Sequence, residues 1–318
     1  MKRLDLNSKT FLVAGAAGFI PSTLAQFYLE QGAKVIGIDN FITGSKSNIE
    51  ILSKYENFTF IEACLFSSFP ALDQFEQIDY IYSLASPASP VDFKQIPLEI
   101  MRVNSEGTLN LLNLAHQRGA RFLEASTSEV YGDPEMHPQP ETYFGSVNPI
   151  GPRSCYDESK RFAEALTMSY HRHYSVDTRI VRIFNTYGPR MRANDGRVIP
   201  NFVNQAINGE DITIYGDGTQ TRSFCYVTDL VNAMHEVMFC HDHTPVNIGN
   251  PDEYLIRDVA EIIKMVLDSK SKIVMKPLPD DDPKKRRPDI SKLLSLSPFK
   301  PQVSFKDGLR QTADYFLQ

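Results

Sequence analysis

Short apolar runs alternate with longer segments of helical periodicity through the first half of the chain. The apolar runs predict six β-strands: Phe11–Ala14, Lys34–Ile38, Phe58–Ile61, Tyr80–Ala85, Arg121–Ala125 and Thr178–Phe184. Apolar residues that recur every three or four positions predict helices at Thr23–Gln31, Ile96–Arg118 and Ser159–Tyr174. Parallel neighbouring strands need such helical crossovers, which lie on both faces of a sheet. The pattern therefore predicts an α/β fold with a doubly wound parallel sheet.

The regular alternation weakens after Tyr187, where segments rich in Gly, Pro and Asn begin. Three further helical stretches are predicted there, at Pro200–Asn208, Asp229–Phe239 and Ile256–Ser269. We therefore expect residues 1–187 to form the sheet domain. Residues 188–318 should mainly form a smaller C-terminal lobe over the carboxyl edge of the sheet, with part of about 222–250 packing back onto the first domain.

Composition and charge exclude several classes of protein. The 318-residue chain is 42% hydrophobic and 23% charged, with a formal net charge of −6. Such a chain can bury a sizeable core, and it lacks the general positive charge that favours nucleic acid or a membrane surface. It has no run of 18 apolar residues and no secretory apolar region near its start. The four cysteines, at 64, 155, 225 and 240, show no metal-binding spacing, so we expect a cytoplasmic protein without a metal site.

A glycine-containing turn lies between the first predicted strand and the first predicted helix. Gly15 and Gly18 allow backbone N–H groups to approach a pyrophosphate at the positive end of the helix dipole. Asp39 ends the next strand, where its carboxylate can accept hydrogen bonds from an adenosine ribose and repel a 2′-phosphate. These residues predict a Rossmann-like domain that binds NAD. Pro21 stands where a third glycine is usual, and a first helical turn tolerates proline because the N–H that it lacks would be unpaired there.

Two polar segments carry candidate acid–base residues. Tyr156 and Lys160 have the spacing Tyr-x-x-x-Lys and share one face of a helix, where the lysine charge can lower the pKa of the tyrosine. A phenolate can take the proton from a sugar hydroxyl while the carbon gives a hydride to nicotinamide. Thr127 and Glu129 follow the strand that ends at Ala125, so they should lie at the carboxyl edge of the sheet, where ligands bind in open α/β folds.

Together these residues resemble the extended short-chain dehydrogenase/reductases, also described as the NAD-dependent epimerase/dehydratase family, and within it the UDP-glucuronate decarboxylases or UDP-xylose synthases. The similarity runs from the Gly15 loop to about Asp289. Its most specific stretches are residues 86–90, 126–132, 137–142, 148–151, 153–158, 182–191, 195–198 and 215–224.

The resemblance implies a redox-neutral cycle on a nucleotide sugar, with UDP-glucuronate as the leading substrate. NAD would oxidise C4, the C6 carboxylate would leave, and reduction of the ketone would give UDP-xylose. Tyr156 would be the acid–base residue, Thr127 would bind the C4 oxygen, Glu129 would act near C5, and Lys160 would support Tyr156 and the nicotinamide ribose.

The resemblance also implies two sets of binding residues. Besides Tyr156 and Lys160, the cofactor set is Gly15, Ala17, Gly18, Phe19, Ile20, Asp39, Asn40, Phe41, Gly44, Leu84, Ala85 and Ser86. The substrate set is Pro87, Ser128, Glu129, Asn185, Arg197, Tyr215, Arg222 and Arg286, in which the arginine forks suit phosphate oxygens. A homodimer is implied as well, formed by the helices that contain residues 96–118 and 156–174.

Three positions depart from the family pattern, all on the cofactor side: Pro21, Cys64 where Asp is usual, and Ser83 where His is usual. They leave open a non-catalytic binding protein built on this fold. Other open alternatives are a sugar-nucleotide 4-epimerase, including one for uronic acids, a 4-dehydrogenase and a 4,6-dehydratase. Ser128 stands where dehydratases usually carry Asp, which removes an expected proton donor and counts against dehydration.

Overall fold

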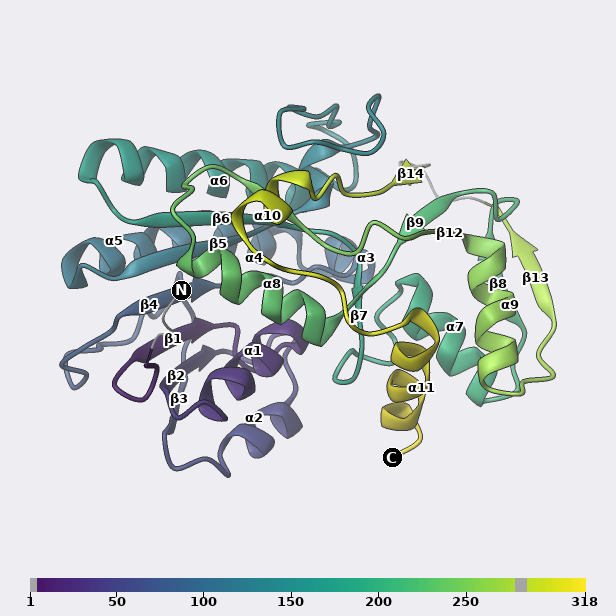
Figure 1. Ribbon diagram of the computed structural model, residues 1–318, viewed down its shortest axis with the longest axis horizontal. Helices are drawn as coiled ribbons and strands as arrows, with labels where there is room; N and C mark the ends of the chain where they lie inside the picture. The colour runs from purple at the N-terminus through teal and green to yellow at the C-terminus, as the bar shows by residue number, and fades with distance from the viewer. Residues whose placement is uncertain (1–4, 278–284) are drawn as a thin grey trace.

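The computed structural model describes residues 5–277 and 285–318. Its central sheet has seven parallel strands in the order β11-β6-β5-β4-β1-β2-β3 (Figure 1). Their bounds are β1 Thr10–Ala14, β2 Lys34–Asp39, β3 Phe58–Glu62, β4 Tyr80–Ser83, β5 Arg121–Thr127, β6 Thr178–Ile183 and β11 Val246–Ile248. The predicted doubly wound α/β fold and its six strands are confirmed. The short strand β11 was not predicted, because three residues are too few to show a periodicity.

Helices cover both faces of the sheet, which explains why its strands are apolar at successive positions. Phe11 and Val13 of β1 pack against helices α1 (Phe19–Leu29) and α8 (Val227–Phe239). Leu12, between them in sequence, points to the other face and packs with α5 (Thr108–Arg118) and α6 (Ser154–Tyr174). All three β1 side chains have no exposed surface. Figure 1 shows the two helical layers on either side of the strands.

Three helix predictions need correction. Helix α6 begins at Ser154 rather than at residue 159, so Tyr156 lies in its first turn. The first helix begins at Phe19 rather than at residue 23, with Pro21 buried in its first turn, where proline was expected to be tolerated. Residues 96–118 do not form one helix: α4 (Pro97–Arg102), a π-helical turn η1 (Val103–Gly107) and α5 follow one another. The π turn coincides with an inward-facing polar contact, because buried Asn104 donates its side-chain amide to Ser159 Oγ of α6 at 2.9 Å.

A second lobe lies beside the carboxyl ends of the sheet and has its own apolar cluster. It contains α7 (Val198–Ile207), α9 (Ile256–Val266) and α11 (Phe305–Phe316), together with β8 (Ile212–Tyr215) and β13 (Ile273–Lys276). The other elements are α2 Lys46–Leu52, α3 Pro90–Gln95, α10 Ser291–Leu296, η2 Ser128–Tyr131, β7 Thr186–Tyr187, β9 Thr221–Ser223, β10 Cys225–Tyr226, β12 Glu253–Leu255 and β14 Lys285–Arg286. By contrast, α8 and β11 pack in the apolar core of the main sheet.

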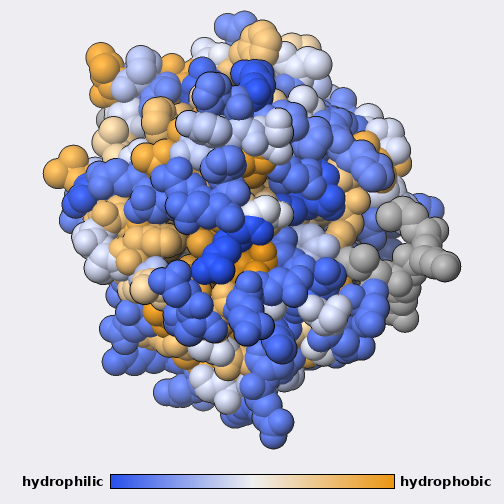
Figure 2. Space-filling view, turned by 90° about the vertical axis from the view of Figure 1, so that its left-hand side faces the viewer, coloured by the Kyte–Doolittle hydropathy of each residue, from blue (hydrophilic) through white to orange (hydrophobic). Residues whose placement is uncertain are grey.

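The molecular surface is mostly polar on the side turned away from α9 and α11. Hydrophilic residues cover most of that face, and hydrophobic residues form small separate groups (Figure 2). Within residues 5–277 and 285–318, none of the helices has the length and apolar character needed to cross a membrane.

Candidate active site

A cavity of about 470 Å³ is lined by residues from the sheet domain and from the second lobe. All but one of the predicted site residues line it. They are Gly15, Ala17, Gly18, Phe19, Ile20, Asp39, Asn40, Gly44, Leu84, Ala85, Ser86, Pro87, Thr127, Ser128, Glu129, Tyr156, Lys160, Asn185, Arg197, Tyr215, Arg222 and Arg286. The exception is Phe41, whose ring packs against Phe60 with 5.3 Å between centroids.

The glycine loop is fitted closely to the ends of the neighbouring strands. Gly15 has φ +81°, and a Cβ atom there would lie 2.8 Å from the Cα of Ala85, so only glycine fits. At Gly44 a Cβ atom would lie 2.6 Å from the Cβ of Ala17. Gly18 caps α1 without a side-chain hydrogen bond. The loop therefore presents backbone without side chains at the positive, N-terminal end of helix α1, which suits the negative charge of a pyrophosphate.

Asp39 is fixed at the end of β2 by two backbone N–H groups. Its Oδ1 accepts from Phe41 N at 2.7 Å, and its Oδ2 accepts from Ala17 N at 3.0 Å. Burial raises the pKa of Asp39, and these two hydrogen bonds act in the opposite direction. Each carboxylate oxygen has a second lone pair, so ribose hydroxyls can still donate to it. The loop and Asp39 together fit an NAD-type dinucleotide.

The three departures from the family pattern occupy different places. Pro21 and Cys64 line the cavity. Burial acts to raise the pKa of the Cys64 thiol, but hydrogen bonds from Ser67 and from the Phe66 backbone outweigh it and lower that pKa. Ser83 is buried in β4, where it is the register partner of Glu124 in β5. The Pro21 ring is accommodated in α1, so it does not remove the dinucleotide cradle.

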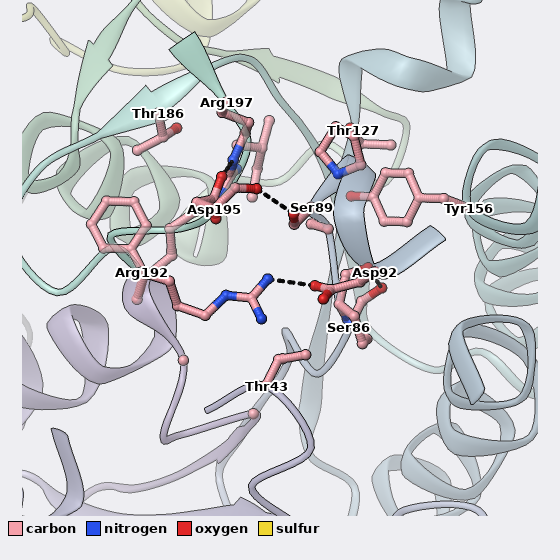
Figure 3. A pocket seen from close by; sticks show the side chains of 18 of the residues that line it. Thr43, Ser86, Ser89, Asp92, Thr127, Tyr156, Thr186, Arg192, Asp195 and Arg197 are labelled. Carbon is pink, nitrogen blue, oxygen red and sulfur yellow. Dashed lines mark hydrogen bonds and ion pairs between the residues drawn. The ribbon is translucent and has the colours of Figure 1, made fainter. Parts of the chain in front are cut away.

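Thr127 and Tyr156 lie together at the carboxyl edge of β5. Thr127 caps the short helix η2, with its Oγ1 accepting from Glu129 N at 3.2 Å. The Tyr156 hydroxyl points toward Thr127 (Figure 3), and its ring stacks on Phe93 with 5.0 Å between centroids. Burial raises the pKa of Tyr156, whereas the hydrogen bond with Thr127 and the charge of Arg197 oppose that rise.

Lys160 is on the same helix as Tyr156, as its spacing predicts, but its ammonium contacts other groups. Its Nζ donates to the Ala125 carbonyl oxygen at 2.6 Å and to Glu124 Oε1 at 3.2 Å. We expected the lysine charge to lower the pKa of Tyr156. The charge of Arg197 acts to lower the pKa of Tyr156, and the ammonium of Lys160 is paired with Glu124.

Glu129 is held between two arginines. Its Oε1 accepts from Arg286 at 2.7 Å, and its Oε2 accepts from Arg153 at 2.6 Å. Burial acts to raise the pKa of Glu129, but the charges of Arg286 and Arg153 outweigh it and lower this pKa to about 2. Arg286 also donates to Ser128 Oγ at 3.0 Å. Glu129 is therefore a carboxylate at neutral pH, inside a cationic pocket.

The small sheet of the second lobe explains the position of Arg286. Strand β14 pairs with β9, and the register places Arg286 beside Arg222. Two guanidinium groups thus reach the cavity from neighbouring strands. The sequence predicted both arginines but not Arg153, whose signal was its position three residues before Tyr156, at the N-cap of α6.

Polar pairs that were not predicted from the sequence link the two lobes across the cavity. Arg192 donates to Asp92 at 2.6 Å, and Ser89 donates to the backbone carbonyl of Asp195 (Figure 3). Asp195 in turn accepts from Arg197, with 2.8 Å between Oδ2 and the guanidinium nitrogen. Arg192 and Asp92, like Ser89 and Asp195, are about one hundred positions apart, so only the folded chain brings them together.

Comparison with known sequences shows which proteins the chain resembles. Residues 11–249 match the profile of the NAD dependent epimerase/dehydratase family. The chain is 47% identical to UDP-glucuronic acid decarboxylase 1 of Danio rerio, over 98% of this chain and 73% of that protein. It is 50% identical to UDP-glucuronic acid decarboxylase 1 of Arabidopsis thaliana, over 96% of this chain and 69% of that protein.

Solved structures with the same architecture bind sugar nucleotides. A UDP-N-acetylglucosamine 4-epimerase from Methanobrevibacter ruminantium, in complex with UDP-N-acetylmuramic acid, superposes with a TM-score of 0.89 at 30% identity, over 98% of each chain. A UDP-glucuronic acid 4-epimerase from Bacillus cereus, in complex with UDP-glucuronic acid and NAD, superposes with a TM-score of 0.86 at 28% identity, over 97% of this chain and 99% of that one.

Proposed function

Because the chain belongs to the NAD dependent epimerase/dehydratase family, we propose that it binds NAD and decarboxylates UDP-glucuronate to UDP-xylose. The family predicted from the sequence is confirmed by this match. The observation that carries the proposed reaction is the cationic pocket around Glu129, formed by Arg286 and Arg153 beside Thr127 and Tyr156. A substrate carboxylate suits this pocket, and the relatives named as decarboxylases act on such a sugar by their printed names.

The cofactor would lie along the carboxyl ends of β1, β2 and β4. The Gly15–Gly18 loop would hold the pyrophosphate, and Asp39 would accept the hydroxyls of the adenosine ribose. When bound, NAD supplies a hydride acceptor for C4 of the sugar and returns the hydride at the end of the cycle.

Tyr156 would take the proton of the C4 hydroxyl while Thr127 donates a hydrogen bond to the same oxygen. Oxidation at C4 makes the sugar a β-keto acid, so the bond from C5 to the C6 carboxylate can break. The electron pair then enters the enolate formed between C5 and C4. Thr127 and the protonated Tyr156 stabilise its oxygen by hydrogen bonds. A proton from solvent water then adds to C5 and restores the 4-ketone, and as C4 is reduced Tyr156 returns its proton to O4.

Glu129 and its arginines would act on the carboxylate end of the sugar. With a pKa of about 2, Glu129 is ionised at neutral pH and anchors the guanidinium groups of Arg286 and Arg153. An incoming substrate carboxylate would share Arg286 with Glu129, since a guanidinium has five N–H donors. Loss of CO2 would relieve the repulsion between the two carboxylates, which favours the decarboxylated product.

A uronic-acid 4-epimerase is the second candidate. It is favoured by the similarity to the Bacillus cereus structure and by the same Thr127–Tyr156 pair, because epimerisation also begins at C4. The two reactions differ in whether the carboxylate is lost. The family match and the decarboxylase relatives count against the non-catalytic role suggested by Pro21, Cys64 and Ser83.

The test is to incubate the purified protein with UDP-glucuronate and with a panel of UDP-, dTDP- and GDP-sugars, with and without added NAD. Mass spectrometry of the nucleotide sugars separates the outcomes. We expect a UDP-pentose from UDP-glucuronate and no product from the Tyr156→Phe variant. A new sugar of unchanged mass would replace decarboxylation by epimerisation. If no sugar reacts and no NAD binds, the enzyme assignment is refuted.

We also propose a homodimer through α4, α5 and α6. These helices pack together and present the exposed apolar side chains Leu98, Met101, Leu109 and Phe162. Light scattering of the wild type is expected to give twice the mass of one chain, and Phe162→Glu should give the single-chain mass. An unchanged mass for this variant would place the interface elsewhere.

A further inference from the structure

A buried carboxylate lies behind the catalytic residues and is not used by the proposed chemistry. Glu124 of β5 has no exposed surface, and its Oε1 lies 3.2 Å from Lys160 Nζ, which is also buried. Lys160 lines the cavity, and Glu124 lies behind it in the sheet. Burying a carboxylate costs several kcal/mol unless a partner compensates it. Its neighbours in β5 are apolar or small, so the charge of Glu124 calls for a specific partner.

The neighbouring strand supplies a second contact to this carboxylate. Ser83 of β4 is the register partner of Glu124, and its hydroxyl donates a hydrogen bond to the carboxylate. Ser83 is one of the three positions at which the chain departs from the family pattern. Since directly paired residues in adjacent strands have close Cβ atoms, a short side chain at 83 leaves room for Glu124 to turn toward Lys160.

The charges around the pair identify Lys160 as the cation that compensates Glu124. Glu164, on the same helix as Lys160, adds a further negative charge near Glu124 but is bound to Arg182 at 2.8 Å. Burial raises the pKa of Glu124, and the charge of Lys160 is the largest effect that opposes this rise.

The groups that shift the pKa of Tyr156 form a separate set. They are Thr127, Glu129, Arg197 and Asp157. Lys160 shares α6 with Tyr156, one turn away, while its ammonium is bound to Glu124 and to the Ala125 carbonyl of β5.

We propose that Glu124 is a positioning residue for Lys160: it holds the ammonium against β5 and offsets the positive charge that Lys160 would otherwise present to Tyr156. The proposal rests on the proposed function, in which Tyr156 is the acid–base residue. Removing the negative charge of Glu124 should favour the phenolate. The acidic limb of the pH profile of kcat should then move to lower pH by about half to one unit.

The first experiment measures that profile with UDP-glucuronate and saturating NAD for the wild type and Glu124→Gln, which keeps an acceptor for Lys160 but loses the charge. Glu164→Gln is the matched control. It removes a carboxylate that lies on the same helix as Lys160 but is bound to Arg182. Glu164→Gln should leave the acidic limb of the pH profile of kcat at its wild-type position. A folded Glu124→Gln enzyme whose limb coincides with that of the wild type would overturn the proposal. If Glu124→Gln does not fold, Ser83→Ala should move the limb in the same direction by less, and no movement would overturn the proposal.

The second experiment does not depend on turnover. Crystal structures of the wild type and of Glu124→Leu report the position of Lys160 Nζ directly. We expect Nζ to leave the Ala125 carbonyl and to turn into the cavity once the carboxylate is gone. If Nζ stays at Ala125, Glu124 does not position it. A wild type without turnover would refute the proposed function, and the crystal structures would still decide the role of Glu124.

Discussion

Asp157, which follows Tyr156 in α6, makes the stability of the protein depend on pH in a defined way. Its side chain is buried, and its Oδ1 has no hydrogen-bond partner within the described part of the chain. Burial raises the pKa of Asp157 from 3.8 to about 7, the charge of Glu129 adds to the rise, and Arg153 and Arg286 oppose it. The folded protein therefore holds a proton on Asp157 at pH values at which the unfolded chain has released it.

The sign and the size of the effect follow from linkage. A raised pKa contributes stability that is fully present below pH 3.8 and is lost as the pH rises through about 7. At about 1.36 kcal/mol for each pH unit, and with Asp157 half-ionised at pH 7, the loss is about 2 kcal/mol between pH 5 and pH 7 and about 3 kcal/mol by pH 8. Glu129, whose pKa is lowered to about 2, contributes stability that is lost only as the pH falls through that value, so the two residues act in different windows.

The assay is urea unfolding of the wild type and of Asp157→Asn at pH 5, 6, 7 and 8. Asparagine does not titrate, so only the wild type loses this stability as the pH rises. The free energy of unfolding of the variant minus that of the wild type should therefore increase by about 3 kcal/mol from pH 5 to pH 8. The exposed Asp314→Asn of α11 is the control and should show a constant difference from the wild type. A pH-independent difference for Asp157→Asn would refute the reasoning, because it would mean that Asp157 is ionised throughout.

Three further predictions concern the cavity. Tyr156→Phe should lower turnover of UDP-glucuronate at least about a thousandfold with little change in melting temperature, and a variant that retains turnover would exclude Tyr156 as the acid–base residue. Gly15→Ala should weaken NAD binding, measured by calorimetry, and lower the free energy of unfolding by about 1 to 3 kcal/mol. The reason is that the added Cβ atom would lie 2.8 Å from Ala85 Cα, at a residue with positive φ. Unchanged NAD binding would contradict the role of the loop. Arg192→Ala should lower the free energy of unfolding by about 1 to 3 kcal/mol because Asp92 is left buried, and the double variant with Asp92→Asn should lose less than the sum of the two single changes.

The sequence was sufficient for the sheet and for part of the cavity lining. The inner strands β1, β2, β4, β5 and β6 are largely buried, and their apolar runs could be recognised along the chain, whereas the edge strand β3 is only partly buried. The loop at Gly15 and the segment at Thr127 could be placed together because ligands bind at the carboxyl edge of parallel strands, whereas most of the other site residues came from the family resemblance.

The parts that were missed depend on tertiary contacts. The π turn at Val103–Gly107 lies in the polar segment Val-Asn-Ser-Glu-Gly, and it coincides with the contact between Asn104 and Ser159, which forms only when α6 is in place. The pairing of Lys160 with Glu124 depends on how α6 packs on β5, and helical spacing says only that Lys160 shares a face with Tyr156. Phe41 was placed at the cofactor by analogy, but the chain turns at this residue with φ +57°, and the ring packs on Phe60.

The most direct test of the account uses UDP-glucuronate that carries deuterium at C4, with unlabelled NAD and purified protein. If the carbon that is oxidised is also the carbon that is reduced, the product is a UDP-pentose that keeps the deuterium at C4, with CO2 released and no accumulation of reduced nicotinamide. A product that retains the carboxylate, a 4-keto pentose formed with stoichiometric reduced nicotinamide, or no conversion at all would contradict the proposed redox-neutral decarboxylation.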